Sequence, residues 1–469
     1  MLFNSYDYFI FLVSVLIGAA VLRKFHKPSE IWFLIAASAF FYGQWNWTYL
    51  LLIYITIVSD YILGLKIYDA RNPKKYLIIS LWVNLGILGF FKYANLLISS
   101  TNQVLDTGGF DYNLQALDIL LPVGISFYTF QSLSYTIDVY RKNLQPRKKI
   151  ADYALFVSFF PQLVAGPIVR ASEFFEQLDK KRKFSYAGAQ AGVMMILIGL
   201  VKKVVFADNL ALIVDPVFNN PENANGWMTL VAIYAFAFQI YFDFSGYTDI
   251  AIGSALLLGF KFPQNFNHPY IALSIRDFWR RWHMTLSRWL RDYLYISLGG
   301  NRGSTLFTGR NLFLTMFLGG LWHGASWNFA FWGTLHGLYL AVERYVLEKS
   351  HFWNHSKHIF SKLFKWFITF HLVCFAWIFF RAKDFSDSWQ IIGNLTDLSS
   401  SVDFGAMPTH IALLVLCFPI LHWLSAKIQL INRSGELSTV YYSLCNSLLL
   451  LALVIFAAQS QESFIYFQF

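Results

Sequence analysis

A histidine lies in the middle of an apolar, glycine-rich stretch of the sequence. His323 is flanked by Gly319, Gly320 and Gly324. An ionisable side chain in such surroundings is costly unless it faces a cavity or a polar partner, and glycines let another backbone or a substrate chain approach closely. Because imidazole titrates near neutral pH, His323 is suited to take the proton from a hydroxyl that attacks a thioester. A packing role or an interhelical hydrogen bond is the alternative.

A second histidine, His336, follows 13 residues later. At about 100° per residue it falls on a different helix face from His323, unless the helix breaks, for which Gly333 is the candidate. We therefore expect a packing role for His336. No nucleophile elbow, zinc-binding HExxH motif or Cys/His cluster accompanies the two histidines, so the sequence predicts no metal site and no serine or cysteine nucleophile.

Residues 276–295 combine arginines with tryptophans. Projected as one helix, the apolar arc consists of Phe278, Trp279, Trp282, Leu286, Trp289, Leu290 and Tyr293, and the opposite arc of Arg276, Asp277, Arg280, Arg281, Arg288 and Arg291. His283 falls at the apolar edge. Such a helix is typical of a membrane-surface anchor. Alternatively, its arginines also bind the phosphates of an anionic donor that arrives from the cytoplasm. The candidate donor-binding residues are Trp279, Arg280, Arg281, Trp282 and Arg288.

Several acidic residues are expected to be structural. Asp243, Ser245 and Asp249 lie in an apolar segment that Ser245-Gly246 should interrupt, where they could cap a helix break or line a tunnel. Asp60, Asp138 and Asp208 lie near loop ends, where solvated or capping roles are the ordinary interpretation.

The composition excludes several classes of protein. Of the 469 residues, 56% are apolar, 14% are charged and 19% are aromatic, with a net charge of +10. A soluble domain carries about 25% charged residues, and a disordered chain is poor in aromatic residues. The basic residues lie between apolar blocks instead of along one solvated face, which argues against nucleic-acid binding. An integral membrane protein is the class that fits.

Apolar blocks long enough to cross a bilayer recur along the chain. We expect about ten membrane-spanning helices, near residues 7–23, 30–47, 48–66, 76–97, 117–140, 186–214, 227–258, 366–381, 409–427 and 438–457. Three further apolar segments, 153–169, 285–299 and 311–345, are interrupted, short or glycine-rich. These predict re-entrant or broken helices, which occur where backbone is buried in protein or lines a cavity.

Loop charge predicts the orientation. Lys and Arg are absent from 99–118, 215–227 and 396–409 and concentrated in 23–28, 66–75, 141–149, 180–183 and 276–291. Placing the basic loops in the cytoplasm puts both termini outside. The first apolar block, which precedes its basic cluster, is expected to be a retained signal anchor. No internal repeat is evident, which argues against a secondary transporter. We expect one membrane domain over residues 1–469.

Two motifs together resemble the signature of the membrane-bound O-acyltransferases (MBOAT): 276–283, ending in His283, and 320–324, containing His323. Further stretches resemble the bacterial alginate O-acetyltransferase branch of that family: 121–127, 165–168 with Arg170, Lys202-Lys203 and 241–247. The resemblance implies an all-helical polytopic protein with a central tunnel, a motif-bearing core of about 120–345 and two additional spans at about 405–460. It implies that His323 is catalytic and that His283 supports it.

The resemblance also implies the reaction. We expect acetyl transfer from a cytoplasmic thioester, acetyl-CoA, to an exported polysaccharide such as alginate, cellulose or peptidoglycan. An exported or membrane-anchored esterase-like protein would relay the acetyl group. Acetyl-CoA is a donor substrate, and no permanently bound cofactor is expected. The expected location is the bacterial inner membrane, in contact with its lipids. The alternatives are D-alanyl transfer to teichoic acid and a non-enzymatic polysaccharide or lipid transporter.

Overall fold

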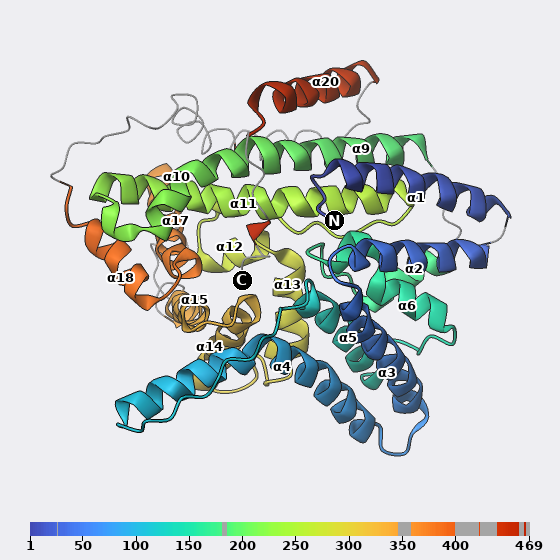
Figure 1. The fold of residues 1–469 in the computed structure, drawn as a ribbon, viewed down its shortest axis with the longest axis horizontal. Helices are drawn as coiled ribbons and strands as arrows, with labels where there is room; N and C mark the ends of the chain where they lie inside the picture. The colour runs from blue at the N-terminus through green and yellow to red at the C-terminus, as the bar shows by residue number, and fades with distance from the viewer. Residues whose placement is uncertain are drawn as a thin grey trace. The chain divides into compact units, whose positions relative to one another are not determined.

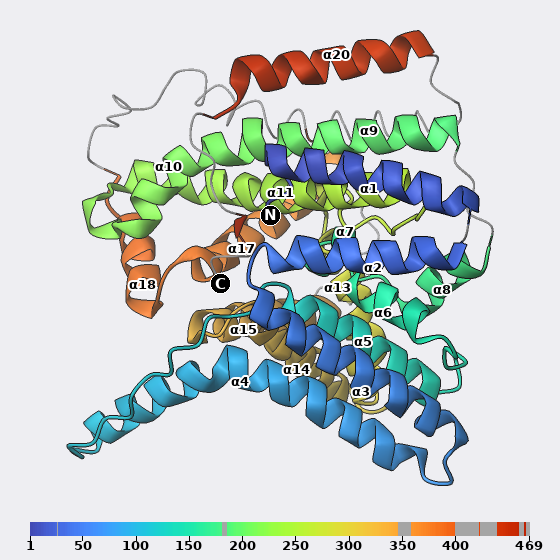
Figure 2. The same ribbon diagram turned by 45° about the vertical axis from the view of Figure 1, so that its right-hand side comes forward.

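The computed structural model describes residues 1–25, 27–180, 185–345, 358–398, 422, 439–458 and 464–465. These residues form helices and connecting loops, without a strand in the described ranges (Figure 1, Figure 2). The chain divides into two compact units. Unit 1 comprises Met1–Ile196 and Ala251–Pro263, and unit 2 comprises Leu197–Ile250 and Gln264–Phe469. The expectation of a single membrane domain is not tested by this division and stays a prediction.

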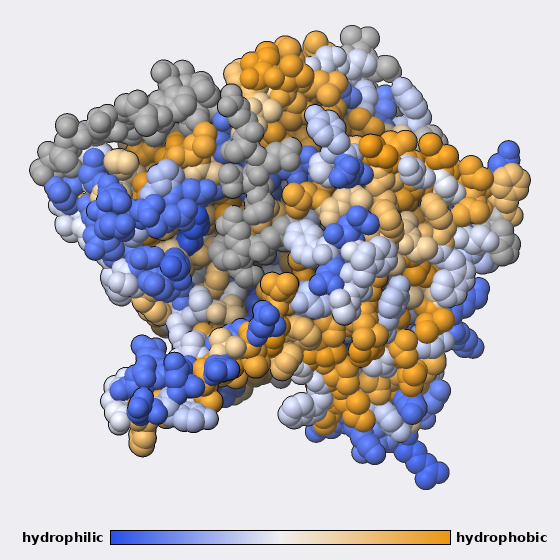
Figure 3. Space-filling view, viewed as in Figure 1, coloured by the Kyte–Doolittle hydropathy of each residue, from blue (hydrophilic) through white to orange (hydrophobic). Residues whose placement is uncertain are grey.

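Unit 1 contains the first helices of the chain. They are α1 (Tyr6–Phe25), α2 (Lys27–Gly43), η1 (Trp47–Tyr49), α3 (Leu50–Asp69), α4 (Pro73–Thr107), α5 (Ile125–Tyr140), α6 (Ile150–Ser158), α7 (Phe160–Leu163), α8 (Ala171–Asp179) and most of α9 (Tyr186–Leu200). Helices α3, α4 and α5 pack side by side (Figure 2). Large apolar side chains such as Ile10, Leu51 and Trp82 are exposed, as expected for surfaces that face lipid. Hydrophobic residues cover broad areas of the face of the molecule drawn in Figure 3.

Unit 2 contains the elements that carry the candidate site. They are η2 (Val201–Ala207), α10 (Asp208–Asn219), η3 (Pro221–Asn223), η4 (Pro269–Ile271), α12 (Ile275–Arg281), α13 (Met284–Trp289), η5 (Leu290–Tyr295), α14 (Thr305–His323), α15 (Trp327–Tyr345), α17 (Ile359–Arg381), α18 (Phe385–Asn394) and α20 (Thr439–Phe456). Helix α11 (Gly226–Leu257) lies mostly in unit 2, and its last residues belong to unit 1. It is continuous through Ser245-Gly246, so the predicted interruption there is wrong.

Five stretches of the described chain are long and apolar enough to cross a bilayer. They are α1, Trp47–Asp69, α4, α11 and α17. The predicted spans at 30–47, 117–140, 186–214 and 438–457 also fall on helices, but α2, α5 and α9 have 17, 16 and 15 residues. The predicted span at 409–427 lies outside the described residues. The polytopic all-helical architecture is confirmed, and the number of spans stays a prediction.

Helix α4 continues well beyond the length that a bilayer requires. Its 35 residues span about 52 Å, against a hydrocarbon core of about 30 Å. Two asparagines attach the returning chain to it. The Asn95 side chain bonds both backbone polar groups of Leu117, at 2.9 and 3.0 Å, and Asn102 does the same with Leu114, at 2.9 Å each. These paired bonds satisfy backbone groups as a neighbouring strand would.

The three acidic residues assigned to loop ends, Asp60, Asp138 and Asp208, are instead buried. The Asp60 carboxylate accepts hydrogen bonds from Ser80 Oγ (2.7 Å), Asn84 Nδ2 (2.7 Å) and Ser132 Oγ (2.6 Å), which joins α3, α4 and α5. Asp208 is 1% exposed and pairs with Lys203 in unit 2. The prediction of a solvated role is wrong for all three residues. Asp60 is bonded by side chains 20 or more residues away in sequence, and Asp208 is paired with the nearby Lys203, so both of these buried carboxylates have the partners that burial requires.

Candidate active site

The arginine- and tryptophan-rich segment 276–295 is broken at His283. Helix α12 begins at the N-cap Ser274, whose side chain accepts from the Asp277 N–H, and ends at Arg281. His283 adopts the left-handed conformation at φ 41° and ψ 54°, and α13 begins after it. The prediction of one continuous helix is therefore wrong. The predicted division between buried apolar and more exposed basic side chains is confirmed, since Phe278, Leu286 and Tyr293 are buried and Arg280 and Arg291 are exposed.

Asn265 holds the break in place. Its Oδ1 accepts from the Thr285 N–H (3.2 Å) and hydroxyl (2.9 Å) and bonds His283 Nδ1 at 3.1 Å. A carbonyl oxygen only accepts, so His283 Nδ1 carries the proton in this bond and Nε2 keeps its lone pair. His283 is fully buried and lies outside the candidate spans, and burial lowers its pKa to about 3. The structure thus contains a neutral imidazole with a fixed tautomer.

Helices α14 and α15 form a tight hairpin that ends α14 at His323. The chain leaves the helix at Gly324 and starts α15 at Trp327, so the break lies here and not at Gly333. A Cβ on Gly320 would lie 2.2 Å from the Phe329 carbonyl oxygen, and one on Gly333 would lie 2.3 Å from that of Met316. The glycines therefore let two backbones approach closely, which confirms one of the two expected uses.

The hairpin brings both of its histidines into contact with one tryptophan. The ring of Trp332 lies 5.1 Å from that of His323 and 4.9 Å from that of His336. His336 Nδ1 accepts a hydrogen bond from Trp279 Nε1 at 3.3 Å, so its lone pair is engaged. His323 is 4% exposed, and its ring centroid lies 6.2 Å from that of His283. The two predicted site histidines are thus neighbours, contributed by segments 40 residues apart.

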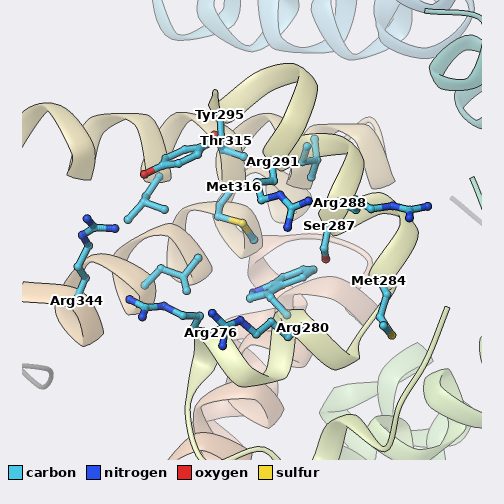
Figure 4. A pocket seen from close by; sticks show the side chains of 14 residues that line it. Arg276, Arg280, Met284, Ser287, Arg288, Arg291, Tyr295, Thr315, Met316 and Arg344 are labelled. Atoms are coloured by element: carbon cyan, nitrogen blue, oxygen red, sulfur yellow. The ribbon is translucent and has the colours of Figure 1, made fainter. Parts of the chain in front are cut away.

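A pocket of about 460 Å³ lies among the same helices of unit 2 (Figure 4). Its wall comes from α12, α13, η5, α14 and α15 and includes five arginines: Arg276, Arg280, Arg288, Arg291 and Arg344. Trp279 also lines it, which connects the pocket wall directly to His336. No acidic side chain is among the described lining residues. A concave site with several guanidinium groups is suited to bind a phosphate-bearing ligand.

Two predicted donor-binding residues do not line this pocket. Arg281 pairs with Asp277 at 2.9 Å and donates to the Asn267 carbonyl oxygen, and Trp282 is fully buried among aromatic rings. Of the predicted set, the pocket contains Trp279, Arg280 and Arg288. Arg276 and Arg291 lie on the predicted basic arc but were not among the residues predicted to bind the donor. Arg344 was not predicted at all. Arg344 lies on α15, and no sequence pattern connects it with residues 276–295.

The two acidic residues singled out on α11 take part in ion pairs, Asp243 in a buried one and Asp249 in a partly buried one. Lys202 pairs with Asp249 at 2.6 Å. Lys203 lies between Asp208 and Asp243, at 2.7 and 2.6 Å. Each carboxylate therefore has a lysine partner, which matches the expected structural use of Asp243 and Asp249.

The fold and the site together define a polytopic membrane protein with a buried histidine pair and an arginine-lined pocket in the same unit. Comparison with known proteins supplies the family. The model of the MBOAT, membrane-bound O-acyltransferase family matches residues 144–383, about half of the chain. The chain is 43% identical over 397 residues to a probable alginate O-acetylase of Pseudomonas aeruginosa, with 83% of this chain and 74% of that protein covered.

Two further relatives carry other acceptor names. The chain is 40% identical over 439 residues to the peptidoglycan O-acetyltransferase of Helicobacter pylori, covering 85% of this chain and 80% of that protein. It is 31% identical over 290 residues to the teichoic acid D-alanyltransferase of Bacillus subtilis, covering 56% and 69%. This chain belongs to the membrane-bound O-acyltransferase family and is a multi-pass membrane O-acyltransferase. The transporter alternative is thereby set aside.

Proposed function

We propose that the protein moves an acetyl group from cytoplasmic acetyl-CoA, through a path inside the membrane, to an exported polysaccharide or to a relay protein. His323 acts as the general base, and His283 supports it. The acceptor hydroxyl gives its proton to His323 while its oxygen attacks the thioester carbonyl. The carbon–sulfur bond then breaks, the ester forms, and the proton passes to the departing thiolate.

The observation that carries this proposal is the short distance between the two histidine rings. His323 is buried at the end of α14, and the ring of His283 lies 6.2 Å away. Burial limits the access of water, which would otherwise compete with the acceptor hydroxyl for the acetyl group. The second histidine is a neutral polar group at the same place, and its Nε2 can accept a hydrogen bond from the acceptor hydroxyl and so orient it.

The arginine pocket supports the choice of donor. Coenzyme A carries several phosphates, and the pocket presents five guanidinium groups close to the segment that contains His283. We assign Arg280, Arg288 and Trp279 to donor binding together with Arg276, Arg291 and Arg344. Arg281 and Trp282 act indirectly, through the packing of α12. Because the basic loops are predicted to be cytoplasmic, this pocket would open toward the donor.

The acceptor class rests on the relatives. Two of them are named for O-acetylation of alginate and of peptidoglycan, which are cell-envelope polymers. We therefore propose an exported polysaccharide as the final acceptor and the bacterial inner membrane as the location. An esterase-like relay protein outside the membrane would complete the transfer.

One experiment tests the catalytic assignment. Membrane vesicles that contain the protein are incubated with acetyl-labelled acetyl-CoA, and label transfer is compared between wild type, His323→Ala and His371→Ala. His371 is the matched control, because it hydrogen-bonds Tyr234 on another part of unit 2. Loss of a general base should reduce transfer by about 100-fold or more. Transfer that survives in His323→Ala would contradict the assignment of the base.

The second candidate is D-alanyl transfer from a carrier-protein thioester. Its support is the 31% identity to a teichoic acid D-alanyltransferase, over 56% of this chain. The two O-acetylating relatives are more similar and cover 83% and 85% of the chain, which favours acetyl. Supplying the same vesicles with a D-alanyl thioester in place of acetyl-CoA discriminates between the two donors.

A further inference from the structure

Two residues late in the chain, Phe464 and Ile465, are buried against α11 in unit 2. Their exposed fractions are 1% and 3%. We call them the 464–465 segment. Their contacts are made with Asp243, Phe244 and Tyr247, which occupy about one turn of α11. The segment therefore touches α11 through both a polar and an aromatic contact.

The polar contact completes a buried charge cluster. Asp243 Oδ1 lies 2.6 Å from Lys203 Nζ, and Asp243 Oδ2 accepts the backbone N–H of Ile465 at 2.8 Å. Lys203 also pairs with Asp208, so one buried cation serves two carboxylates. A buried carboxylate needs hydrogen bonds to both oxygens to offset its desolvation. The Ile465 amide supplies the second of these, and it does so from the backbone, whatever the side chain.

The aromatic contact leads to the candidate active site. The Phe464 ring stacks on Tyr247, with centroids 4.3 Å apart and an interplanar angle of 23°, and lies 5.8 Å from Phe244. Phe244 meets His283 edge to face, with centroids 4.7 Å apart. A row of contacting rings thus runs from Phe464 through Phe244 to the imidazole that lies beside His323.

We propose that the 464–465 segment is a positioning element for acyl transfer: it holds Phe244 against His283 and so keeps the imidazole in its orientation toward His323. The catalytic part of this inference rests on the function proposed above, whereas the contact with His283 does not. Asn265 fixes His283 from one side through Nδ1. Phe244, supported by Phe464, restricts the ring from another.

The geometry also predicts which kinetic constant changes. None of the described residues that line the arginine pocket belongs to α11 or to the 464–465 segment. Loosening the segment should therefore leave the KM for acetyl-CoA unchanged. Displacing a group near the reacting atoms by about 1 Å can cost up to about 100-fold in rate. Because His283 stays partly held by Asn265, we expect a kcat loss of about tenfold.

The test compares five proteins purified in detergent: wild type, Phe464→Ala, Phe464→Tyr, Phe464→Leu and Phe456→Ala. Tyrosine retains the stacked ring, and leucine retains apolar volume without the ring, which keeps the fold testable if alanine fails to fold. Phe456→Ala, at a 49% exposed position on α20, is the control. The first measurement needs no acyl transfer: histidines are modified with diethyl pyrocarbonate, and the modification of His283 is quantified by mass spectrometry relative to His371.

We expect modification of His283 to rise at least about fivefold in Phe464→Ala and Phe464→Leu, and to stay at the wild-type level in Phe464→Tyr and Phe456→Ala. In the acetyl transfer assay, kcat should fall about tenfold in Phe464→Ala at constant KM, and tyrosine should restore it. Unchanged protection of His283 in the alanine and leucine variants would overturn the inference. If wild type transfers no acetyl group while protection of His283 still depends on Phe464, the proposed function fails and the contact stands. If the protection of His283 changes but kcat does not, the 464–465 segment contacts His283 without serving as a positioning element for acyl transfer.

Discussion

The proton on His283 is placed by a single side chain. Asn265 Oδ1 receives the Nδ1–H, so the Nε2 lone pair is the one available on the side of the ring away from Asn265. His336 has the opposite arrangement, because Trp279 donates to its Nδ1. Two buried histidines in one cluster therefore differ in which nitrogen accepts a proton. Sequence analysis could select histidines by type and surroundings, but their tautomers depend on partners that it could not identify.

The arginines differ in a way that can be measured. Arg280 and Arg344 line the pocket, whereas Arg281 is paired with Asp277 and does not. We expect Arg280→Gln and Arg344→Gln each to raise the KM for acetyl-CoA about tenfold, because a lost charge-assisted hydrogen bond costs about 1.5 kcal/mol. Arg281→Gln is the matched control, with an expected change below about twofold. Equal KM values in all three variants would favour the membrane-anchor interpretation of this segment.

At the scale of elements, residues 276–295 show a limit of helical periodicity, because the apolar pattern continues through a break in the helix at His283. The apolar and basic arcs of 276–295 were predicted correctly, because a break of one or two residues changes the projection little. The break itself depends on Asn265, whose Oδ1 binds His283 Nδ1 and the N–H and hydroxyl of Thr285. Nothing in the periodicity of 276–295 indicates that interaction. The same limitation applies to the α14–α15 hairpin, where Gly333 was the predicted break and the chain instead leaves the helix at Gly324.

The close contact between α14 and α15 yields a prediction at this scale. A Cβ at Gly320 would lie 2.2 Å from the Phe329 carbonyl oxygen, and backbone cannot move aside as a flexible side chain can. Gly320→Ala should therefore push α14 and α15 apart and destabilise the protein by about 1–3 kcal/mol. It should also reduce acetyl transfer, because His323 lies on α14 and its neighbour Trp332 lies on α15. Thermal unfolding in detergent and the vesicle assay measure the two effects.

Gly309→Ala on the same helix provides the matched control. Its added Cβ would lie 3.4 Å from the Tyr345 ring, which is ordinary van der Waals contact. Alanine is the better helix former, so stability should be unchanged or slightly increased. A Gly320→Ala protein that unfolds at the same temperature as Gly309→Ala would show that the hairpin is less tightly packed than the structure indicates.

At the scale of the whole molecule, composition alone predicted the class. The membrane character, the helical architecture and most helix positions follow from apolar blocks, and the family was indicated by two short motifs. What could not be predicted was tertiary: Asp60 is buried by three partners from two other helices, and Arg344 joins arginines that precede it by more than 50 residues. Such contacts require the packing, and no local pattern encodes them.

The predicted orientation can be tested across a single helix. Lys74 and Asp111 are exposed residues near the two ends of α4, which is long enough to cross the bilayer. With Cys374, Cys417 and Cys445 replaced by serine, we expect Asp111→Cys to react with a membrane-impermeant maleimide in intact cells. Lys74→Cys should react only after the membrane is permeabilised, because basic loops stay in the cytoplasm. The reverse labelling pattern would show that the orientation in the membrane is the opposite of the predicted one.

The arginine pocket has a consequence for the empty enzyme. Five guanidinium groups, contributed by four helical segments, lie around one hollow without an acidic side chain among the described lining residues. Arg291 pairs with Asp292 at 2.6 Å, outside the lining, yet five like charges around one hollow still repel one another. Under the proposed function, we expect a bound polyphosphate to act as a counter-ion that ties α12, α13, η5 and α15 together. Occupancy by the proposed donor and rigidity of these segments should then be thermodynamically linked.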